Sequence, residues 1–355
     1  MKQNQKKKIS IFFVLLLSWF FLQGLIYASP SSNKYGFIDK KGIIVIAAQF
    51  DQVGIFSEGL APVAIGGKWG YIDKTGKVVI DPKFFQAYPF KDGIASIGMK
   101  DESGPMGYKW GCIDKEGKTI IEPFANAPLL FSEGLSPFFE EKSGKCGYID
   151  NKGIVIIAPQ FKLPVGSFSD GLADIPHDGK YAYIDKMGKV AFTVEFEEIS
   201  PFSEGLAWFR NTDSKYGYID KTGKVVIDPQ FDFTSGFSDG FASVEIEGKW
   251  GFIDKAGKTI IPIKFDLVEN FFEGMAAVKI GEKWGYLNKA GQVAIPAKYE
   301  NAGFFFFQEG LAPIKAGDKW GFIDKAGKTI IEPQFNYVGI FSEGLAIFTP
   351  VGRQE

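Results

Sequence analysis

The chain has little of what enzymes commonly use for catalysis, because its 355 residues include one histidine, His177, and two cysteines, Cys112 and Cys146. Metal and acid–base sites need converging partners, and we expect His177 to lie in a surface turn without them. The cysteines occupy slots that are aromatic in other copies of the repeat described below, so we expect small buried side chains; a disulfide in an oxidising compartment is the alternative. The sequence predicts no catalytic residue, no cofactor and no enzymatic activity.

Arginine is nearly absent as well, with only Arg210 and Arg353 in the whole chain. The forked guanidinium is the side chain best suited to phosphate contacts, and the lysines are spread through turns instead of forming a basic stripe. Nucleic acid is therefore excluded as an expected partner.

The N-terminal segment has the pattern of a secretory signal peptide. Lysines precede an apolar run over residues 9–22, and small residues follow around Ala28. We predict a signal peptide over residues 1–28, cleaved after Ala28, and a short linker over 29–33. The alternative is an uncleaved anchor, which would be the only contact with a membrane. The chain is expected to be exported, to the periplasm, the cell surface or the extracellular space. Loss of four of the 40 basic residues leaves 36 against 42 acidic ones, a net charge of −6.

Residues 34–348 consist of copies of one motif, seen most clearly as KWGFIDKAGKTIIEPQFNYVGIFSEGLAIF over residues 319–348, and residues 349–355 form a tail. A fixed period of this length is typical of repeats that bury their faces against one another. Nine copies follow at spacings of 34 to 41 residues, counted at Gly36, Gly70, Gly111, Gly147, Ala182, Gly217, Gly251, Gly285 and Gly321.

Each copy contains two turn signals between short apolar stretches. Asp324 and Gly327 enclose the first, where the carboxylate accepts a backbone N–H and the glycine adopts a positive φ; Asn288 replaces the aspartate in one copy. Glu343-Gly344 marks the second turn. The pattern predicts an all-β chain of nine units of about 35 residues, each a three-stranded antiparallel meander.

These residues resemble the WG-repeat family of bacterial proteins. The resemblance rests on Trp-Gly followed by an aromatic residue, Ile-Asp and the Lys-x-Gly-Lys turn, and on Phe-Ser-Glu-Gly-Leu-Ala, over roughly residues 33 to 348. Tyr35, Tyr216 and Cys146 replace the tryptophan, and Tyr181-Ala182 replaces the pair in the fifth copy. The resemblance implies a β-rich, often exported protein and carries no activity or site residue.

The Trp-Gly strand is apolar on both faces, so it must be covered on both sides by neighbouring repeats. We expect its glycine to allow close approach of the next repeat. The first copy lacks the strand that precedes its hairpin, and the last copy ends with such a strand, Leu345 to Phe348. This split favours a closed or nearly closed propeller-like ring, with an open superhelical arc as the alternative.

Acidic residues in the second turn offer one weak alternative for metal binding. Calcium loops need a denser ligand spacing, so we expect these residues to serve the turn, but a closed ring would arrange them as a circle of carboxylates. The nine are Glu58, Asp92, Glu133, Asp170, Glu204, Asp239, Glu273, Glu309 and Glu343.

Variation between copies gives the expected binding residues. Three and five residues after the glycine of the second turn, residue types vary from copy to copy, and we expect these positions to form a solvent-exposed strand face. Trp208 and Arg210 on this face are typical of binding hot spots, with Pro137, Phe139, Phe304 and Phe305 as weaker candidates. The alternative is that Trp208 fills space beside the divergent fifth copy.

The expected function is an exported, non-enzymatic repeat scaffold that binds a protein or a cell-surface component. A glycan- or cell-wall-binding module is the second hypothesis, because the chain is rich in aromatic residues. An enzyme is a distant third.

Overall fold

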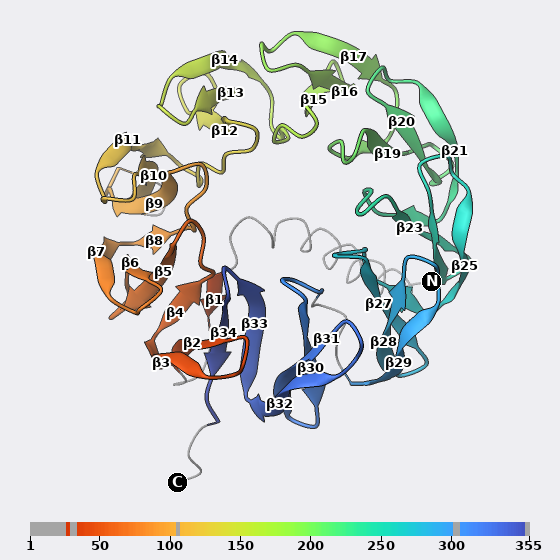
Figure 1. Cartoon of the computed structure of the whole chain (residues 1–355). Helices are drawn as coiled ribbons and strands as arrows, with labels where there is room; N and C mark the ends of the chain where they lie inside the picture. Colours follow the sequence, from red (N-terminus) through yellow and green to blue (C-terminus); the bar gives the residue numbers. More distant parts are fainter. Residues whose placement is uncertain (1–25, 29–33, 104–106, 301–305, 352–355) are drawn as a thin grey trace.

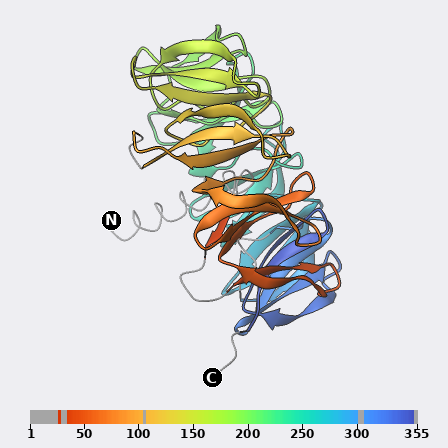
Figure 2. The same cartoon turned by 90° about the vertical axis from the view of Figure 1, so that its left-hand side faces the viewer.

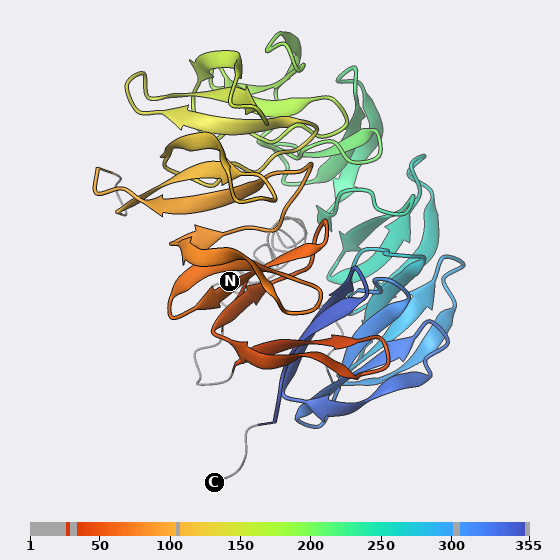
Figure 3. The same ribbon diagram turned by 60° about the vertical axis from the view of Figure 1, so that its left-hand side comes forward.

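Nine antiparallel sheets surround a common centre and form a nine-bladed β-propeller (Figure 1). The computed structural model describes residues 26–28, 34–103, 107–300 and 306–351. In side view the sheets of successive blades stack face to face (Figure 2, Figure 3). The all-β repeat expected from the sequence is confirmed. Within the described residues, no helix has the length and hydrophobicity needed to cross a membrane.

The blades are numbered here in chain order. Blade 1 contains β33 (Tyr337–Ser342), β34 (Leu345–Thr349), β2 (Tyr35–Asp39) and β3 (Ile44–Phe50). Blade 2 contains β4 (Gln52–Gly54), β5 (Leu60–Ile65), β6 (Lys68–Asp73) and β7 (Val78–Phe84), and β1 (Ile26–Ala28) pairs with β4. Blade 3 contains β8 (Gln86–Ala87), β9 (Ala95–Lys100), β10 (Tyr108–Ile113) and β11 (Thr119–Ala125).

Blade 4 contains β12 (Leu135–Glu140), β13 (Lys145–Asp150) and β14 (Val155–Phe161). Blade 5 contains β15 (Ala173–His177), β16 (Lys180–Ile184) and β17 (Val190–Val194). Blade 6 contains β18 (Glu198–Ile199), β19 (Leu206–Arg210), β20 (Tyr216–Asp220) and β21 (Val225–Phe231).

Blade 7 contains β22 (Phe233–Thr234), β23 (Ala242–Ile246), β24 (Lys249–Ile253) and β25 (Thr259–Phe265). Blade 8 contains β26 (Leu267–Val268), β27 (Met275–Ile280), β28 (Lys283–Asn288) and β29 (Val293–Tyr299). Blade 9 contains β30 (Leu311–Ala316), β31 (Lys319–Asp324) and β32 (Thr329–Phe335).

The two ends of the repeat array meet in blade 1 and close the ring. Strand β2 from the first copy pairs antiparallel with β34 from the last, with Gly36 opposite Phe348 and Asp39 opposite Leu345. The expected closure is confirmed. The three-strand unit needs a correction, because most blades gain a short fourth strand at the inner edge, such as β8 in blade 3.

The first turn has the predicted conformation. In blade 1, Oδ1 of Asp39 accepts hydrogen bonds from the N–H groups of Lys41 and Ile43, both at 2.9 Å, and Gly42 has a φ of 78°. Asn288 accepts the same two bonds in its copy, from Ala290 and Gln292. The turn leads into the outer strand of each blade, which lies on the rim (Figure 1).

The glycine of the Trp-Gly pair allows a close approach, but not of the neighbouring repeat. A Cβ atom on Gly321 would lie 2.3 Å from the carbonyl oxygen of Ile331 in the outer strand of the same blade. Strand β32 bulges towards β31 there, since Trp320 pairs with Phe335 while Phe322 pairs with Ile331. The tight contact therefore lies within one sheet, and the expectation of contact between repeats was wrong.

The fifth copy shows what happens when this glycine is lost. Ala182 pairs directly with Thr193, and Tyr181 pairs with Val194, so the bulge is absent from this segment. Strand β17 has five residues, where the outer strands of the other blades have seven. The alanine is tolerated because the outer strand no longer approaches the backbone.

Apolar clusters fill the spaces between blades. The cluster between blades 2 and 3 joins Trp69, Tyr71 and Phe84 of one sheet to Phe90 and Ile97 of the next blade. An aromatic ring contact recurs at these junctions, as between Tyr71 and Phe90, whose centroids are 4.8 Å apart. The inner strands are thus covered on both faces, as expected.

Candidate binding site at the junction of blades 3 and 4

Adjacent blades are joined by a repeated set of polar contacts, which we call the clasp. At the junction of blades 1 and 2, the Glu343 carboxylate accepts a bond from the N–H of Gly59 at 3.0 Å. Nζ of Lys74 lies 3.1 Å from the same carboxylate oxygen. Oγ of Ser342 donates to the carbonyl of Phe56 at 2.7 Å. The clasp thus combines an acidic residue and a serine of one blade with a glycine N–H, a lysine and a phenylalanine carbonyl of the next.

The second turn holds the acidic residue in place. Its two central residues both have positive φ, as in Glu58 at 54° and Gly59 at 88°, and Ser57 and Leu60 exchange two backbone hydrogen bonds. This is the geometry of a two-residue type I′ hairpin turn, which is strained for an acidic residue. The carboxylate–glycine bond recurs for eight of the nine acidic residues, namely Glu58, Glu133, Asp170, Glu204, Asp239, Glu273, Glu309 and Glu343.

These contacts account for the acidic residue of this turn at the eight junctions where they form. Burial raises the pKa of Glu58, but hydrogen bonds from Lys115 and from the N–H of Gly93 outweigh it, so the pKa is lowered overall. The first lysine of the Asp-Lys-x-Gly-Lys turn takes part as well, since seven of these lysines form ion pairs with the preceding blade. No group of three or more metal-ligating side chains occurs within the described ranges.

The junction of blades 3 and 4 departs from this arrangement. The acidic residue is Asp92, the serine is replaced by Lys91, and the lysine of the next blade is replaced by Asn151. None of the clasp contacts forms there among the described residues. Asp170 and Asp239 show that an aspartate can reach the glycine N–H. The shorter side chain of aspartate therefore does not by itself explain the missing contact.

The apolar packing changes at the same place. Cys112 occupies the slot that holds an aromatic ring in the other copies, so the ring contact with Phe131 is lost. The thiol is buried, and burial raises its pKa to about 12, so it is a poor nucleophile. Cys146 is also buried and free, so the two cysteines form no disulfide in this structure.

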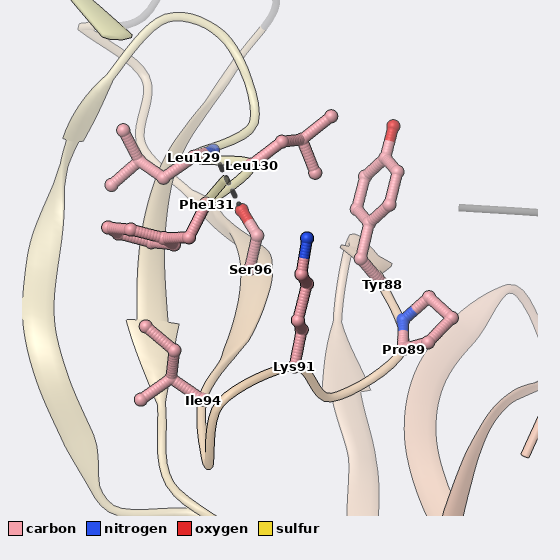
Figure 4. Close-up of a pocket in the computed structure, with 8 residues that line it drawn as sticks. All are labelled: Tyr88, Pro89, Lys91, Ile94, Ser96, Leu129, Leu130 and Phe131. Atoms are coloured by element: carbon pink, nitrogen blue, oxygen red, sulfur yellow. Dashed lines mark hydrogen bonds between the residues drawn. The ribbon is translucent and has the colours of Figure 1, made fainter. Parts of the chain in front are cut away.

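A small cavity lies where the clasp is missing. It encloses about 30 Å³ and is lined by Tyr88, Pro89, Lys91, Ile94, Ser96, Leu129, Leu130 and Phe131. Figure 4 shows the Lys91 side chain extended along the cavity between Ser96 and Tyr88. Ser96 accepts a hydrogen bond from the N–H of Leu129 at 3.0 Å, the one polar contact drawn across the gap. The cavity has room for one or two water molecules or the tip of a side chain.

An exposed aromatic ring stacks on a half-buried one at the same blade. Phe85 is 47% exposed and stacks on Tyr108 with ring centroids 4.2 Å apart. In the preceding junction the same position is Asp51, which pairs with Lys34. Phe85 therefore takes the place of an acidic partner for Lys68, and blade 3 presents rings where other blades present ion pairs.

The strand face expected to be exposed is mostly buried. Of the residues three positions after the turn glycine, Pro62, Ser96, Ser243, Ala277, Pro313 and Ile347 are buried, and Pro137, Asp174 and Trp208 are half-buried. The expectation was wrong because this strand is an inner strand of the sheet, so neighbouring blades cover both faces.

Trp208 and Arg210 have partners within the protein. Trp208 packs at its edge on Tyr216, 5.4 Å between centroids, in the cluster between blades 6 and 7. It therefore does not fill space beside the fifth copy. Arg210 forms ion pairs with Glu197 at 3.0 Å and Glu198 at 2.8 Å. The hydrogen bond to Glu198 raises the arginine pKa, and its charge is compensated before any partner arrives.

The weaker candidates divide between described and undescribed residues. Pro137 and Phe139 on β12 are half-buried and lie opposite Tyr148 and Cys146. Phe304 and Phe305 lie outside the described residues, as do residues 1–25 and 29–33 of the predicted signal peptide and linker. His177 ends strand β15, and the turn itself is Asp178-Gly179.

Two carboxyl groups that belong to no clasp have raised pKa values. Burial raises the pKa of Asp174 to about 6 and that of Glu269 to about 8. Oδ1 of Asp174 is buried without a hydrogen-bond partner. The two residues belong to blades 5 and 8, so they do not form a catalytic pair.

Sequence reasoning missed the site at blades 3 and 4, although a signal was present. Lys91, Cys112 and Asn151 each depart from the residue that most copies carry in that column. Each substitution alone is unremarkable. Their coincidence at one junction becomes visible only when the columns are assigned to neighbouring blades.

Comparison with protein families supports the repeat assignment. A family described as WG containing repeat matches residues 35–69, 69–101, 110–123, 147–181, 181–216, 216–250, 250–284, 284–320 and 320–349. Residues 124–146, which form one side of the junction described above, lie outside these matches. The search of curated proteins gave no match.

Solved structures resemble the chain in fold. A crystal structure of a eukaryotic initiation factor is 11% identical, with a TM-score of 0.59, and the match covers 91% of this chain and 100% of that one. BamB from Moraxella catarrhalis is 12% identical over 92% of this chain and all of its own, with a TM-score of 0.36. Virginiamycin B lyase from Staphylococcus aureus is 16% identical over 74% of this chain and 93% of its own, with a TM-score of 0.34. Only the first match has a TM-score above 0.5, so it alone bears on the fold.

Proposed function

The chain belongs to the WG containing repeat family, and on that premise we propose that it is an exported, non-enzymatic scaffold that binds a protein or a cell-surface component. The observation that carries the proposal is the junction of blades 3 and 4. Repeat proteins commonly keep packing residues constant and vary binding residues. At this junction three packing residues are replaced together, by Lys91, Cys112 and Asn151, and a small cavity lies between the blades.

The chemistry of the junction suits recognition better than catalysis. Tyr88 and Lys91 offer an aromatic ring and a cation beside apolar side chains, a combination typical of binding hot spots. The proposal of export rests on the lysines and the apolar run before Ala28. Cell fractionation with N-terminal sequencing of the mature protein tests that part; an intact N-terminus in the cytosol would contradict it.

Capture from the native cell envelope tests the binding site. The tagged full chain is crosslinked to its partners and compared with Lys91→Ala and Tyr88→Ala. We expect both variants to lose the partner, and Lys91→Ala to keep the parent melting temperature. Gln308→Ala is the matched control, since Gln308 occupies the column of Lys91 in blade 9. Equal capture by all four proteins would refute the proposed site.

Glycan binding is the second candidate function, and the stacked pair Phe85 and Tyr108 favours it. Exposed aromatic faces stack on sugar rings, and Lys68 beside them lacks the acidic partner that Lys34 has in Asp51. A glycan array probed with the full chain and with Phe85→Ala tests this function. Sugar binding lost in the variant would support a glycan binder, and an array without signal would exclude the glycans it displays.

A further inference from the structure

The clasp at blades 3 and 4 leaves specific groups of blade 4 without their usual partners. In the other eight junctions, the N–H of the turn glycine donates to a carboxylate of the preceding blade, as Gly93 does to Glu58 at 3.1 Å. The corresponding group in blade 4 is the N–H of Gly134. Asp92 does not accept from it among the described contacts.

The turn of blade 4 is nevertheless built like the others. Glu133 and Gly134 have φ values of 53° and 85°, close to those of the equivalent residues in blade 2. Glu133 itself accepts from Gly171 of the next blade and pairs with Lys186 at 3.1 Å. The Gly134 N–H is therefore directed towards blade 3, as its equivalents are directed towards their preceding blades.

The groups around Gly134 favour an anion. Serine donates to the phenylalanine carbonyl in six junctions, for example Ser132 to Phe168 at 2.7 Å. At blades 3 and 4 the serine is Lys91, whose ammonium group lies along the cavity (Figure 4). The groups without their usual partners at this junction are a backbone N–H and an ammonium group, both hydrogen-bond donors, and Leu129, Leu130 and Ile94 line the cavity. Together they match a carboxylate next to an apolar side chain.

We propose that a protein partner completes this clasp with an acidic side chain of its own. The partner's carboxylate accepts from the N–H of Gly134 and pairs with Lys91, and an adjacent apolar side chain enters the cavity between Leu129, Leu130 and Tyr88. The choice of a carboxylate follows from the molecule itself, because carboxylates occupy this N–H in the other eight junctions. This inference rests on the proposed binding function and specifies its chemistry.

Asp92 is an acidic group near the proposed site that opposes the incoming carboxylate, whereas the charge of Glu133 is paired with Lys186. Asp92 is exposed and has no ion pair at this junction among the described contacts. Its charge repels an acidic ligand, whereas that of its neighbour Lys91 attracts one. Substitutions of these adjacent residues must therefore change the affinity in opposite directions, which a merely structural role would not produce.

A peptide probe tests the chemistry on the full chain. The probe is a fluorescent cyclic peptide that displays the repeat's own Phe-Ser-Glu-Gly turn, and its control carries glutamine in place of glutamate. We expect the glutamine peptide to bind about tenfold more weakly. Lys91→Ser should weaken binding of the glutamate peptide about fivefold, and Asp92→Asn should strengthen it about twofold. Equal binding of the two peptides, no detectable binding, or changes of the same sign in the two variants would overturn the proposal.

A repaired clasp gives a test that unfolding cannot mimic. The variant Lys91→Ser with Asp92→Glu and Asn151→Lys restores the residues most common at the other junctions. We therefore expect a higher melting temperature and loss of binding to both the peptide and the native partner. If the repaired variant still captured the partner while Lys91→Ala or Tyr88→Ala lost it, the acidic clasp would be overturned and the binding function would stand. A native partner whose capture ignores every junction variant would refute the proposed site itself.

Discussion

At the scale of single residues, the glycine of the Trp-Gly pair is fixed by contacts within its own sheet. The outer strand bulges so far that one of its carbonyl oxygens, and the backbone nitrogen two residues later, lie within 3 Å of where a Cβ atom would be. The same contacts recur at Gly36, Gly70 and Gly285. Ala182 is compatible with the fold only because its blade has lost the bulge. The signature residue of the repeat is thus a requirement of one bulged hairpin.

Gly321→Ala should therefore destabilise the protein. The added Cβ would lie 2.3 Å from the carbonyl oxygen of Ile331, and overpacking of this kind costs on the order of 2 kcal/mol. Thermal unfolding followed by calorimetry measures the change. Gly236→Ala is the control, because its Cβ would meet Ser203 at an ordinary 3.5 Å. An unchanged melting temperature for Gly321→Ala would contradict the bulge argument.

Asp174 should make stability depend on pH. Its pKa in the folded chain, about 6, lies above that of an unfolded aspartate because the carboxyl is buried without a partner. The folded state therefore binds the proton more tightly, and stability falls as the pH rises from about 4 to 6. Asp174→Asn should add on the order of 2 kcal/mol at pH 8 and little at pH 4.

Unfolding midpoints at the two pH values test the Asp174 prediction. Asp178→Asn is the matched control, since the Asp178 side chain is 94% exposed and should show no such difference. A gain of equal size at both pH values would point to a change in packing instead of charge.

At the scale of elements, the second turn serves as a connector between blades. Its type I′ geometry directs an acidic side chain at the glycine N–H of the next blade, and the lysine of the Asp-Lys-x-Gly-Lys turn approaches the same carboxylate. Positive φ at an acidic residue costs free energy, which the clasp offsets. Two turns far apart in each copy are therefore coupled through the neighbouring copy.

Glu58→Gln should weaken the junction of blades 2 and 3 only at pH values at which the glutamate is ionised. The pKa of Glu58 is lowered in the folded chain by Lys115 and the Gly93 N–H acting against burial. Its stabilisation is therefore present above pH about 4 and is lost as the pH falls. Because the pair is partly exposed, we expect a loss under about 1 kcal/mol at pH 7 and none at pH 3.

Denaturation at the two pH values measures the effect of Glu58→Gln. Glu122→Gln, at an exposed position on β11, is the control that should change neither value. The clasp would lose its electrostatic interpretation if the loss persisted at pH 3.

At the scale of the whole molecule, closure removes the two ends that an open arc would expose. The outer strands still form edges on the rim, and there they carry prolines such as Pro82, Pro229 and Pro333 beside exposed valine and isoleucine side chains. Proline cannot donate to an added strand, so these edges are protected against pairing with another chain. Strand pairing therefore protects the two ends of the array, and proline protects the outer edges on the rim.

Deletion of residues 340–355 should destabilise both ends of the array. It removes β34, the partner of β2, so β2 and β3 lose their place in blade 1. Hydrogen exchange should show protection lost in residues 35–38 as well as in residues 337–339, the part of β33 that remains. Loss confined to the C-terminal copy would contradict closure in solution.

The ring should open first at the junction of blades 3 and 4. This junction lacks the clasp contacts and the aromatic ring contact that recur elsewhere. We expect faster amide exchange at Trp110–Ile113 and Leu129–Leu135 than at the equivalent positions of blades 6 and 7. Cys112→Phe, which restores the ring, should slow exchange there. Uniform exchange at both junctions would show that hydrophobic packing alone holds the blades together.

The sequence by itself determined the repeat and the hairpin turn, and it favoured a closed ring over an open arc. Each rests on a local requirement that is written nine times, such as the Asp39 carboxylate that caps its own turn. The ring followed from a strand missing before the first copy and present after the last. Repetition makes such signals readable because every copy meets the same physical demand.

Tertiary structure decided what each position contacts. The face of Trp208 is covered because the strand lies between two blades, and Gly321 meets its own outer strand because that strand bulges. The second-turn acid contacts a glycine about 35 residues away, in the next copy. Contacts between copies depend on how blades stack, which no single copy encodes, and so the open junction between blades 3 and 4 emerged only from the folded ring.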